Sequence, residues 1–301
     1  MGSLRALKRR INISKNIAKI TKAMQMVSAS KMKRAEEQVT QAIPYAEGIY
    51  EIVSKLGNIR GYKSIYLKKP KKIKNILIII VGPSRGFVGD LTSRLIVELS
   101  NNIEKIKRNY PDVKMVGLSI HKQGLKIATT VGIEPRYHFA TYFESPNTTT
   151  LSPIYKVVLD GYKSGFFNEV YISFAHFVNS IVQVPKFKRV LPITFEESLS
   201  EQKSNDKESI EKQENDFIFE PDMSKVLDFL LPEYFETQIL TAILDSNASE
   251  HAARMVAMKN ATDNAQELVK TLTHEYNKTR QSEITKEILE VAAGANESLL
   301  H

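Results

Sequence analysis

Apolar residues near the N-terminus recur with the period of a coiled-coil helix. Their steps of four, three, four and three residues form a heptad stripe: Ile13, Ile17, Ile20, Met24 and Val27. No proline precedes Pro44, and no glycine lies between Gly2 and Gly48. A helix of some 40 residues would be about 60 Å long. The spacing predicts one long helix whose apolar stripe is the seam with another helix, with Lys15, Lys19 and Lys22 on the opposite face.

The C-terminal part of the chain shows the same pattern over a longer stretch. Residues 233–293 contain neither glycine nor proline, which corresponds to about 90 Å of continuous helix. Apolar residues again recur at steps of three and four: Ala265, Leu268, Leu272, Tyr276, and then Ile284, Ile288, Val291 and Ala295. Small residues crowd positions 248–265, where they would let another helix approach closely. Two long helices at opposite ends of the chain predict an antiparallel coiled coil.

The middle of the chain alternates between strand and helix patterns. Strands are predicted at 75–82, 113–119, 169–177 and 181–191, the last two as a hairpin around Asn179 and Ser180. Helices are predicted at 90–108, 121–131 and 151–164. Alternation of this kind favours a small α/β domain with a mainly parallel sheet. The expected fold class is therefore α/β plus coiled coil.

These patterns predict four segments. Residues 1–58 are expected to be the N-terminal helix of the coiled coil, and residues 74–195 the central α/β domain. Residues 196–218 are polar, acidic and poor in aromatic side chains, so a flexible loop is expected there. Residues 219–301 are expected to form the C-terminal helix of the coiled coil.

Charge is distributed unevenly over the 301 residues, which carry a formal net charge of +8. The first 43 residues hold ten basic side chains and two acidic ones, whereas residues 233–301 are net acidic. A basic helix can grip nucleic-acid phosphates, but it can equally meet acidic protein surfaces. Since no recognition module for nucleic acid is present, the charge favours a protein partner. A basic coiled-coil nucleic-acid-binding or scaffold protein is the alternative.

Several kinds of site are missing from the sequence. With no cysteine, the chain cannot form a disulfide framework, a thiolate metal site or a cysteine nucleophile. The six histidines are scattered without metal-ligand spacing, and no serine lies in a nucleophile elbow. The longest apolar run, 76–81, is far shorter than the roughly 20 residues that span a bilayer. We expect no catalytic, cofactor-binding or metal-binding residue and no direct membrane span.

The turn at 82–90 (GPSRGFVGD) lies between a predicted strand and a predicted helix, where phosphate loops occur. A phosphate loop requires lysine and then serine or threonine after its last glycine, but Asp90 and Leu91 follow here. The dinucleotide pattern requires glycine at the position of Ser84. A tight structural turn is therefore predicted, in preference to a nucleotide site.

Four stretches of the chain carry a family resemblance. They are TKAMQMVSASKMKRAEEQ (21–38), FEPD (219–222), ASEHAARMVAMKNATDNAQEL (248–268) and YNKTRQSEITKEILEVAAGA (276–295). Together they strongly resemble the gamma subunits of rotary F-type ATP synthases. The resemblance implies an antiparallel coiled coil beside a Rossmann-like α/β domain. It also implies a rotor inside a ring of alpha and beta subunits, with its foot on the membrane c-ring next to the epsilon subunit.

The function implied by the resemblance is that of a central-stalk rotor subunit. Ion-driven rotation of the c-ring would be coupled through it to ATP synthesis or hydrolysis on the beta subunits, so the chain itself would be neither an enzyme nor a nucleotide-binding or nucleic-acid-binding protein. By the same resemblance, Met24, Arg254 and Gln281 match positions near acidic loops of the catalytic ring, and Arg280 and Thr285 lie in the same matching segment as Gln281. Arg9 and Lys22 belong to a basic patch that can steer the helix against carboxylates of the ring. Each of these residues could instead belong to the coiled-coil core or to a solvated face.

The sequence departs from the family in the centre. The family commonly has a GLCG-type turn, where this chain has GFVGDLT (86–92), with Val88 and Thr92 at the cysteine and asparagine positions. The cysteine-containing insert of the chloroplast type is absent, and there is no N-terminal extension for a mitochondrial transit peptide. These features indicate a bacterial-type subunit, peripheral to the cytoplasmic side of the plasma (inner) membrane.

Overall fold

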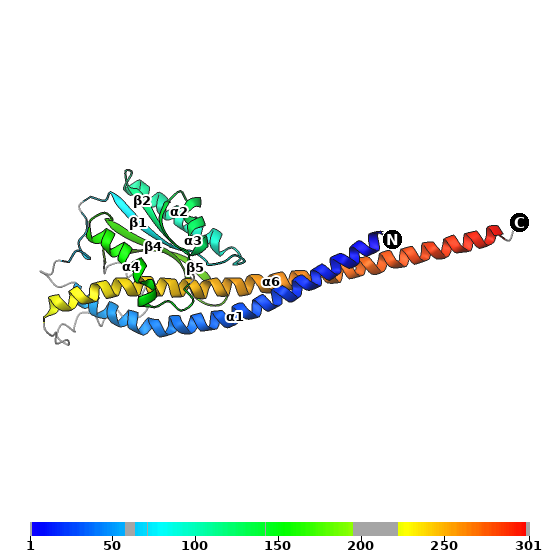
Figure 1. Ribbon diagram of the computed structural model, residues 1–301, viewed down its shortest axis with the longest axis horizontal. Helices are drawn as coiled ribbons and strands as arrows, with labels where there is room; N and C mark the ends of the chain where they lie inside the picture. Colours follow the sequence, from blue (N-terminus) through cyan, green and yellow to red (C-terminus); the bar gives the residue numbers. More distant parts are fainter. Residues whose placement is uncertain (1, 58–63, 71, 142, 195–221, 299–301) are drawn as a thin grey trace, which may run out of the picture. The chain divides into compact units, whose positions relative to one another are not determined.

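The chain begins and ends with a long helix, and the α/β elements lie between the two in the sequence (Figure 1). The computed structural model describes residues 2–57, 64–70, 72–141, 143–194 and 222–298. The helices are α1 (Gly2–Gly57), α2 (Leu91–Asn109), α3 (His121–Thr130), α4 (Thr148–Lys163) and α6 (Met223–Ser298). The strands are β1 (Asn75–Val81), β2 (Lys114–Ile120), β3 (Glu134–Phe139), β4 (Glu169–Phe177) and β5 (Gln183–Leu191). The predicted fold class is confirmed.

The chain divides into two units, to each of which both long helices contribute. Met1–Ala29 and Arg254–His301 form the paired-helix unit, and Ser30–Ala253 form the α/β unit. The four segment boundaries expected from the sequence stay a prediction. The acidic loop expected at 196–218 lies outside the described residues.

Both long helices continue through residues that usually end a helix. α1 contains Pro44, and α6 begins ten residues earlier than the glycine- and proline-free stretch and contains Pro232. A proline inside a helix costs about 3 kcal/mol because it removes a hydrogen bond and crowds the preceding turn. Burial of Leu231, Tyr234 and Phe235 around Pro232 offsets this cost, since each large side chain contributes about 1.5–3 kcal/mol.

The sheet of the α/β unit has the strand order β3-β2-β1-β4-β5. β1 to β4 are parallel, and β5 pairs antiparallel with β4. The predicted hairpin between the last two strands is confirmed. Its turn is braced by the Asn179 side chain, whose carbonyl oxygen accepts hydrogen bonds from the backbone N–H groups of Ile181 and Val182 at 2.9 and 2.8 Å. Because the chain winds outward from β1 in both directions, the strand order reverses between β1 and β4.

Helices cover both faces of the sheet, so β1 is apolar along its whole length. Ile76, Ile78 and Ile80 pack with α2 and α3 on one face. Leu77, Ile79 and Val81 pack on the other face with α4 and with the parts of α1 and α6 that belong to this unit. Strands buried on both faces are expected in parallel sheets, which is why β1 is a continuous run of apolar residues.

β3 was missed by the sequence analysis. Its residues (EPRYHF) alternate between exposed and half-buried positions, and the strand contains Pro135. Because β3 is an edge strand, one side of its backbone needs no ladder partner, and proline is tolerated there. A polar edge strand lacks the apolar run that identifies a central strand.

Candidate functional site

The paired-helix unit contains all seven residues singled out from the sequence, so its surface is the first candidate site. Within it, α1 and α6 are antiparallel: Leu7 and Ile11 pack with Leu272, while Thr21 lies opposite Thr262. The two threonine hydroxyls are 2.7 Å apart. The antiparallel pairing predicted from the sequence is thus confirmed.

Small side chains form the centre of the seam. Ser14, Ala18 and Ser28 are buried on α1, and Thr262 and Ala265 are buried on α6. Small residues at these positions let the two backbones approach closely. The seam residues of α1 also recur at steps of four and three. Each of them lies one position after a residue of the large aliphatic stripe.

The prediction that this aliphatic stripe forms the seam is wrong. Ile13, Ile17 and Ile20 are 48%, 46% and 60% exposed, Val27 is also exposed, and Met24 is half-buried. The physical reason is that the smaller residues one position along allow closer helix packing, so the large ones are turned outward. On α6, Ala265 and Leu272 are buried as predicted, but Leu268 is exposed and Tyr276 is half-buried.

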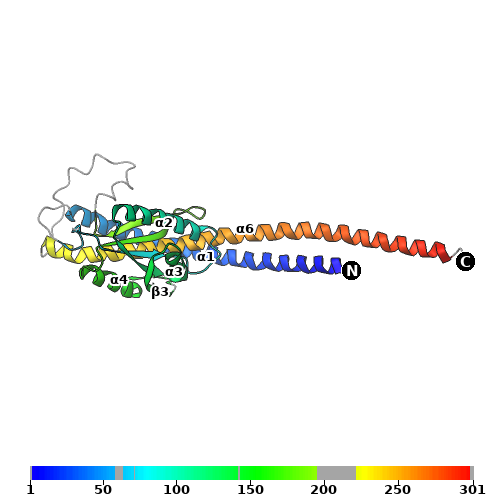
Figure 2. The ribbon, with the colours of Figure 1, turned by 90° about the horizontal axis from the view of Figure 1, so that it is seen from above.

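α6 continues past the N-terminal end of α1 (Figure 2). In this extension four large aliphatic side chains are exposed: Ile284, Ile288, Leu289 and Val291. The stripe on α1 and this set on α6 are therefore two groups of exposed large aliphatic side chains on the unit. Groups of exposed apolar side chains rimmed by polar residues mark protein interfaces.

Exposed cations occupy the same stretch of α1 as the aliphatic stripe, with Lys15, Lys19 and Lys22 on the other side of the helix. The first 29 residues contain no acidic side chain, and their seven basic ones are all exposed: Arg5, Lys8, Arg9, Arg10, Lys15, Lys19 and Lys22. Among the described residues, none of these seven forms an ion pair; Lys22 Nζ donates a hydrogen bond to Gln25 Oε1 at 3.2 Å. A shallow groove of about 390 Å³ between the helices is lined by Lys19, Lys22, Met26 and Gln266 together with two alanines. The surface therefore suits a partner that is apolar and acidic.

The seven candidate residues occupy different environments within the unit. Arg9, Lys22, Arg280, Gln281 and Thr285 are exposed, and Met24 is half-buried. Arg280, Gln281 and Thr285 all lie on the extension of α6, where the Thr285 hydroxyl donates to the Gln281 carbonyl one helical turn earlier at 2.9 Å. Arg254 is only 9% exposed, so it is the least accessible of the seven. The sequence analysis missed the exposed isoleucines as contact candidates; the small-residue stripe was the signal that could have revealed them.

A second candidate lies at the carboxyl ends of β1 and β4, where doubly wound sheets bind ligands. Here α6 occupies the crevice. Ser246 Oγ accepts a hydrogen bond from the Ala175 N–H at 3.2 Å, and Ser249 Oγ donates to the Ala175 carbonyl at 3.0 Å. Asp245 pairs with His176 Nδ1 at 2.8 Å. The chain's own helix thus takes the place that a ligand has in related folds.

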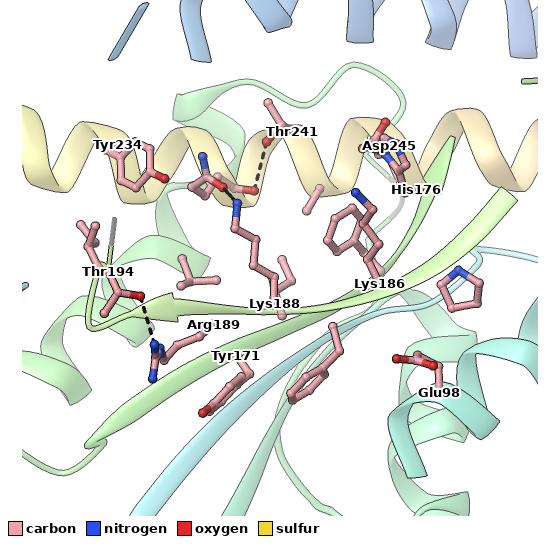
Figure 3. A pocket seen from close by; sticks show the side chains of 18 residues that line it. Glu98, Tyr171, His176, Lys186, Lys188, Arg189, Thr194, Tyr234, Thr241 and Asp245 are labelled. Carbon is pink, nitrogen blue, oxygen red and sulfur yellow. Dashed lines mark hydrogen bonds and ion pairs between the residues drawn. The ribbon is translucent and has the colours of Figure 1, made fainter. Parts of the chain in front are cut away.

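A groove of about 630 Å³ follows the edge strand β5 and α6 (Figure 3). Its charged lining is mixed, with Lys186, Lys188 and Arg189 against Glu98 and Asp245. Its polar groups bond to one another: Lys188 Nζ donates to Gln238 Oε1 at 2.8 Å, and Arg189 donates to Thr194 Oγ1 at 3.0 Å. No nucleophile–base pair of the kind used in catalysis is assembled among these lining residues.

The part of the chain that the structure describes offers neither a metal site nor a membrane span. Within the described residues, no three His, Cys, Asp or Glu side chains are grouped so that they could hold a metal ion. None of the described helices combines the length and the apolar character needed to cross a membrane.

His121 is a buried histidine beside the turn at 82–90. Its Nδ1 lies 2.9 Å from the Gly82 carbonyl, and its φ is +63°. Burial lowers the pKa of His121, while the Gly82 carbonyl and the charge of Glu250 act in the opposite direction more weakly. The folded state therefore favours the neutral imidazole, which contributes stability above the ordinary histidine pKa of about 6.5.

This stability should be lost as the pH falls below about 6.5, because the unfolded chain then binds a proton more readily than the folded one. We expect His121→Asn to make the decline in unfolding free energy between about pH 7 and pH 5 shallower. Asparagine tolerates a positive φ, so backbone strain should not dominate the comparison. Urea denaturation of both proteins at several pH values measures the effect, and parallel declines would contradict it.

Comparison with known proteins gives a consistent result over almost the whole chain. A family profile described as ATP synthase matches residues 3–297. The ATP synthase gamma chain of Roseiflexus castenholzii is 38% identical over 299 residues, with 98% of both chains covered. The gamma chains of Chloroflexus aurantiacus and Dehalococcoides mccartyi are 36% and 35% identical, again covering 98% of this chain.

Solved structures resemble the chain in fold. The rotor of the Euglena gracilis mitochondrial ATP synthase matches with a TM-score of 0.62 at 19% identity, covering 94% of this chain and 99% of the other. The central stalk of the Tetrahymena thermophila mitochondrial ATP synthase matches with a TM-score of 0.54 at 20% identity, covering 80% and 99%. At these identities the likeness concerns the fold alone.

Proposed function

The chain belongs to the ATP synthase gamma-chain family, and from that premise we propose that it is the central-stalk rotor subunit of an F-type ATP synthase. As such it is a non-catalytic subunit: synthesis and hydrolysis of ATP take place on the beta subunits of the assembly. Its task is to couple ion-driven rotation of the c-ring to those sites. The alternative of a stand-alone nucleic-acid-binding or scaffold protein has no support among the relatives.

The proposed partners are the alpha and beta subunits of the catalytic ring, the epsilon subunit and the membrane c-ring. Two observations support the ring contact. The stripe of Ile13, Ile17 and Ile20 is exposed, and the same stretch of α1 carries exposed cations that form no ion pair with another described residue. Buried apolar area supplies contact energy, and complementary charge supplies orientation.

A rotor of this kind acts through unequal contacts. The paired-helix unit is not symmetric, because α6 continues alone beyond the end of α1 and presents a different set of side chains there. Each beta subunit would therefore meet a different face of the rotor at a given angle. Contacts that stabilise one conformation of a catalytic site over another shift the equilibrium between the two conformations. A face that binds both conformations equally leaves that equilibrium unchanged.

For the individual contacts we propose seven residues: Arg9, Lys22, Met24, Arg254, Arg280, Gln281 and Thr285. The exposed members can touch the ring directly, with the cations facing its carboxylates. Arg254, buried within the chain, would act by holding α6 in position. The subunit would be peripheral to the membrane, and we place it on the cytoplasmic side of a bacterial plasma membrane, since the chain lacks the cysteine-containing insert of the chloroplast type.

Reconstitution tests this function. The chain is mixed with purified alpha and beta subunits of a related gamma-chain-containing synthase, and the complex is isolated by size exclusion before ATP hydrolysis is measured. We expect the chain to co-elute with the ring and to stimulate hydrolysis well above that of alpha and beta alone. Failure to co-elute, or co-elution without stimulation, would contradict the proposed function.

A further inference from the structure

The loop that follows β1 holds a buried carboxylate. Glu250, on α6, is 1% exposed, and both of its oxygens accept hydrogen bonds from Ser84. The backbone N–H of Ser84 donates to Oε2 at 2.7 Å, and its hydroxyl donates to Oε1 at 2.6 Å. A charged group can be buried only where donors replace its hydration, and hydrogen bonds of this charge-assisted kind are short and strong.

The position of this contact is where the fold class binds anionic ligands. The loop leaves the carboxyl end of β1, next to the point at which the strand order reverses between β1 and β4. In nucleotide-binding members of this fold class, backbone N–H groups of this first loop face a phosphate. Here a carboxylate of the same chain faces the N–H of Ser84.

The loop is held rigidly at its start. A side chain on Gly82 would place its Cβ 2.2 Å from the backbone nitrogen of Gly124 on α3, so the two backbones are in direct contact. Further along, Phe87 has a φ of +62° and is 72% exposed. A non-glycine residue keeps such a backbone conformation only where the surroundings enforce it.

We propose that the loop at 82–90 is an anion cradle whose resident ligand is the carboxylate of Glu250. The two donors of Ser84 match the two oxygens of a carboxylate. If Glu250 were removed, the same donors would bind a small free carboxylate. In this arrangement Glu250 is a positioning residue: it joins α6 to the loop and keeps the loop in the form that exposes Phe87. Because Glu250 is tethered, its effective concentration at the cradle is far higher than that of a free anion.

Glu250→Ala tests the proposal by chemical rescue on the full-length chain alone. The variant should melt about 5 °C or more below the parent, since at least the two hydrogen bonds that Ser84 donates to a charged group are lost. Sodium acetate should then raise its melting temperature more than sodium chloride of equal concentration, by about 3 °C once acetate is tenfold above its Kd. The parent should respond equally to the two salts.

Two matched variants separate rescue at the cradle from a general salt effect. Glu250→Gln keeps the cradle filled by an amide oxygen, so it should show no preference for acetate. Adding Ser84→Ala to Glu250→Ala removes one donor and should reduce the acetate-specific gain. An equal acetate effect in the parent and Glu250→Ala, or undiminished rescue without the Ser84 hydroxyl, would overturn the proposal.

A spectroscopic measurement covers the case in which Glu250→Ala does not fold. In ¹⁵N-labelled parent protein, the Ser84 amide proton should resonate downfield, as expected for a short hydrogen bond to a carboxylate, and Glu250→Gln should move it upfield. An unchanged Ser84 resonance would overturn the proposal. Neither experiment needs another subunit, so their outcome is independent of the rotor function.

Discussion

The triple substitution of Ile13, Ile17 and Ile20 by serine should remove most of the stimulation of ATP hydrolysis in a reconstituted ring, while the isolated chain keeps its melting temperature. The three side chains are about half exposed in the chain, so they contribute little to its stability. If the ring covers their exposed surface, each side chain would contribute about 1 kcal/mol or more to the free energy of binding. Their loss should therefore weaken the productive contact by at least about a hundredfold.

Ala18→Leu is the matched control on the same helix. Ala18 is buried in the seam one position from Ile17, and a leucine there would force the closely packed helices apart, at a cost of about 1–3 kcal/mol. Thermal unfolding by circular dichroism and ATP hydrolysis are measured for both variants. If the serine variant lost helix stability as Ala18→Leu does, the assignment of the outward face would be wrong.

Gly82→Ala should be the most damaging single substitution in the α/β unit. Its new Cβ would lie 2.2 Å from the Gly124 nitrogen and 2.6 Å from the Gly124 Cα. Both are backbone atoms, so no side chain can rotate away and α3 or β1 must move. We expect a loss of about 3 kcal/mol or more in unfolding free energy, measured by urea denaturation.

Gly86→Ala provides the comparison within the same loop. A Cβ on Gly86 meets no heavy atom within 4 Å, and its φ does not lie in the left-handed region. The unfolding free energy should change by no more than about 0.5 kcal/mol. Equal effects of the two alanine substitutions would show that the close approach of the loop to α3 is not what excludes a side chain at position 82.

The elements that could be predicted from the sequence are those with strong local patterns. β1 is a run of apolar residues because it is buried on both faces, and the long helices lack breakers over most of their length. The antiparallel pairing followed from the position of these helices at the two ends of the chain. β3 could not be predicted, since an edge strand with Pro135 and alternating polar residues has no apolar run.

The face of α1 that forms the seam could not be predicted from hydrophobicity alone. Two stripes with the same heptad spacing lie one residue apart, one of large aliphatic residues and one centred on Ser14, Ala18 and Thr21. Periodicity cannot choose between them. The choice depends on how closely the partner helix approaches, which is decided by residues some 240 positions away, such as Thr262 opposite Thr21.

The turn at 82–90 illustrates the same limit. The lack of a phosphate-loop signature was visible in the sequence, but the carboxylate held by Ser84 comes from Glu250, 166 residues along the chain. No local pattern connects the two residues. The pairing arises because α6 crosses the carboxyl end of the sheet, which only the assembled α/β unit reveals.

Rotation of single molecules tests the rotor function most directly. The chain has no cysteine, so Lys107→Cys, at an exposed position on α2, accepts one probe at a defined place. The labelled chain is assembled with immobilised alpha and beta subunits and observed while ATP is supplied. We predict stepwise rotation of the probe in one direction, lost with the serine variant of Ile13, Ile17 and Ile20. ATP hydrolysis by the complete assembly with a probe that stays fixed, or that moves without direction, would contradict the account.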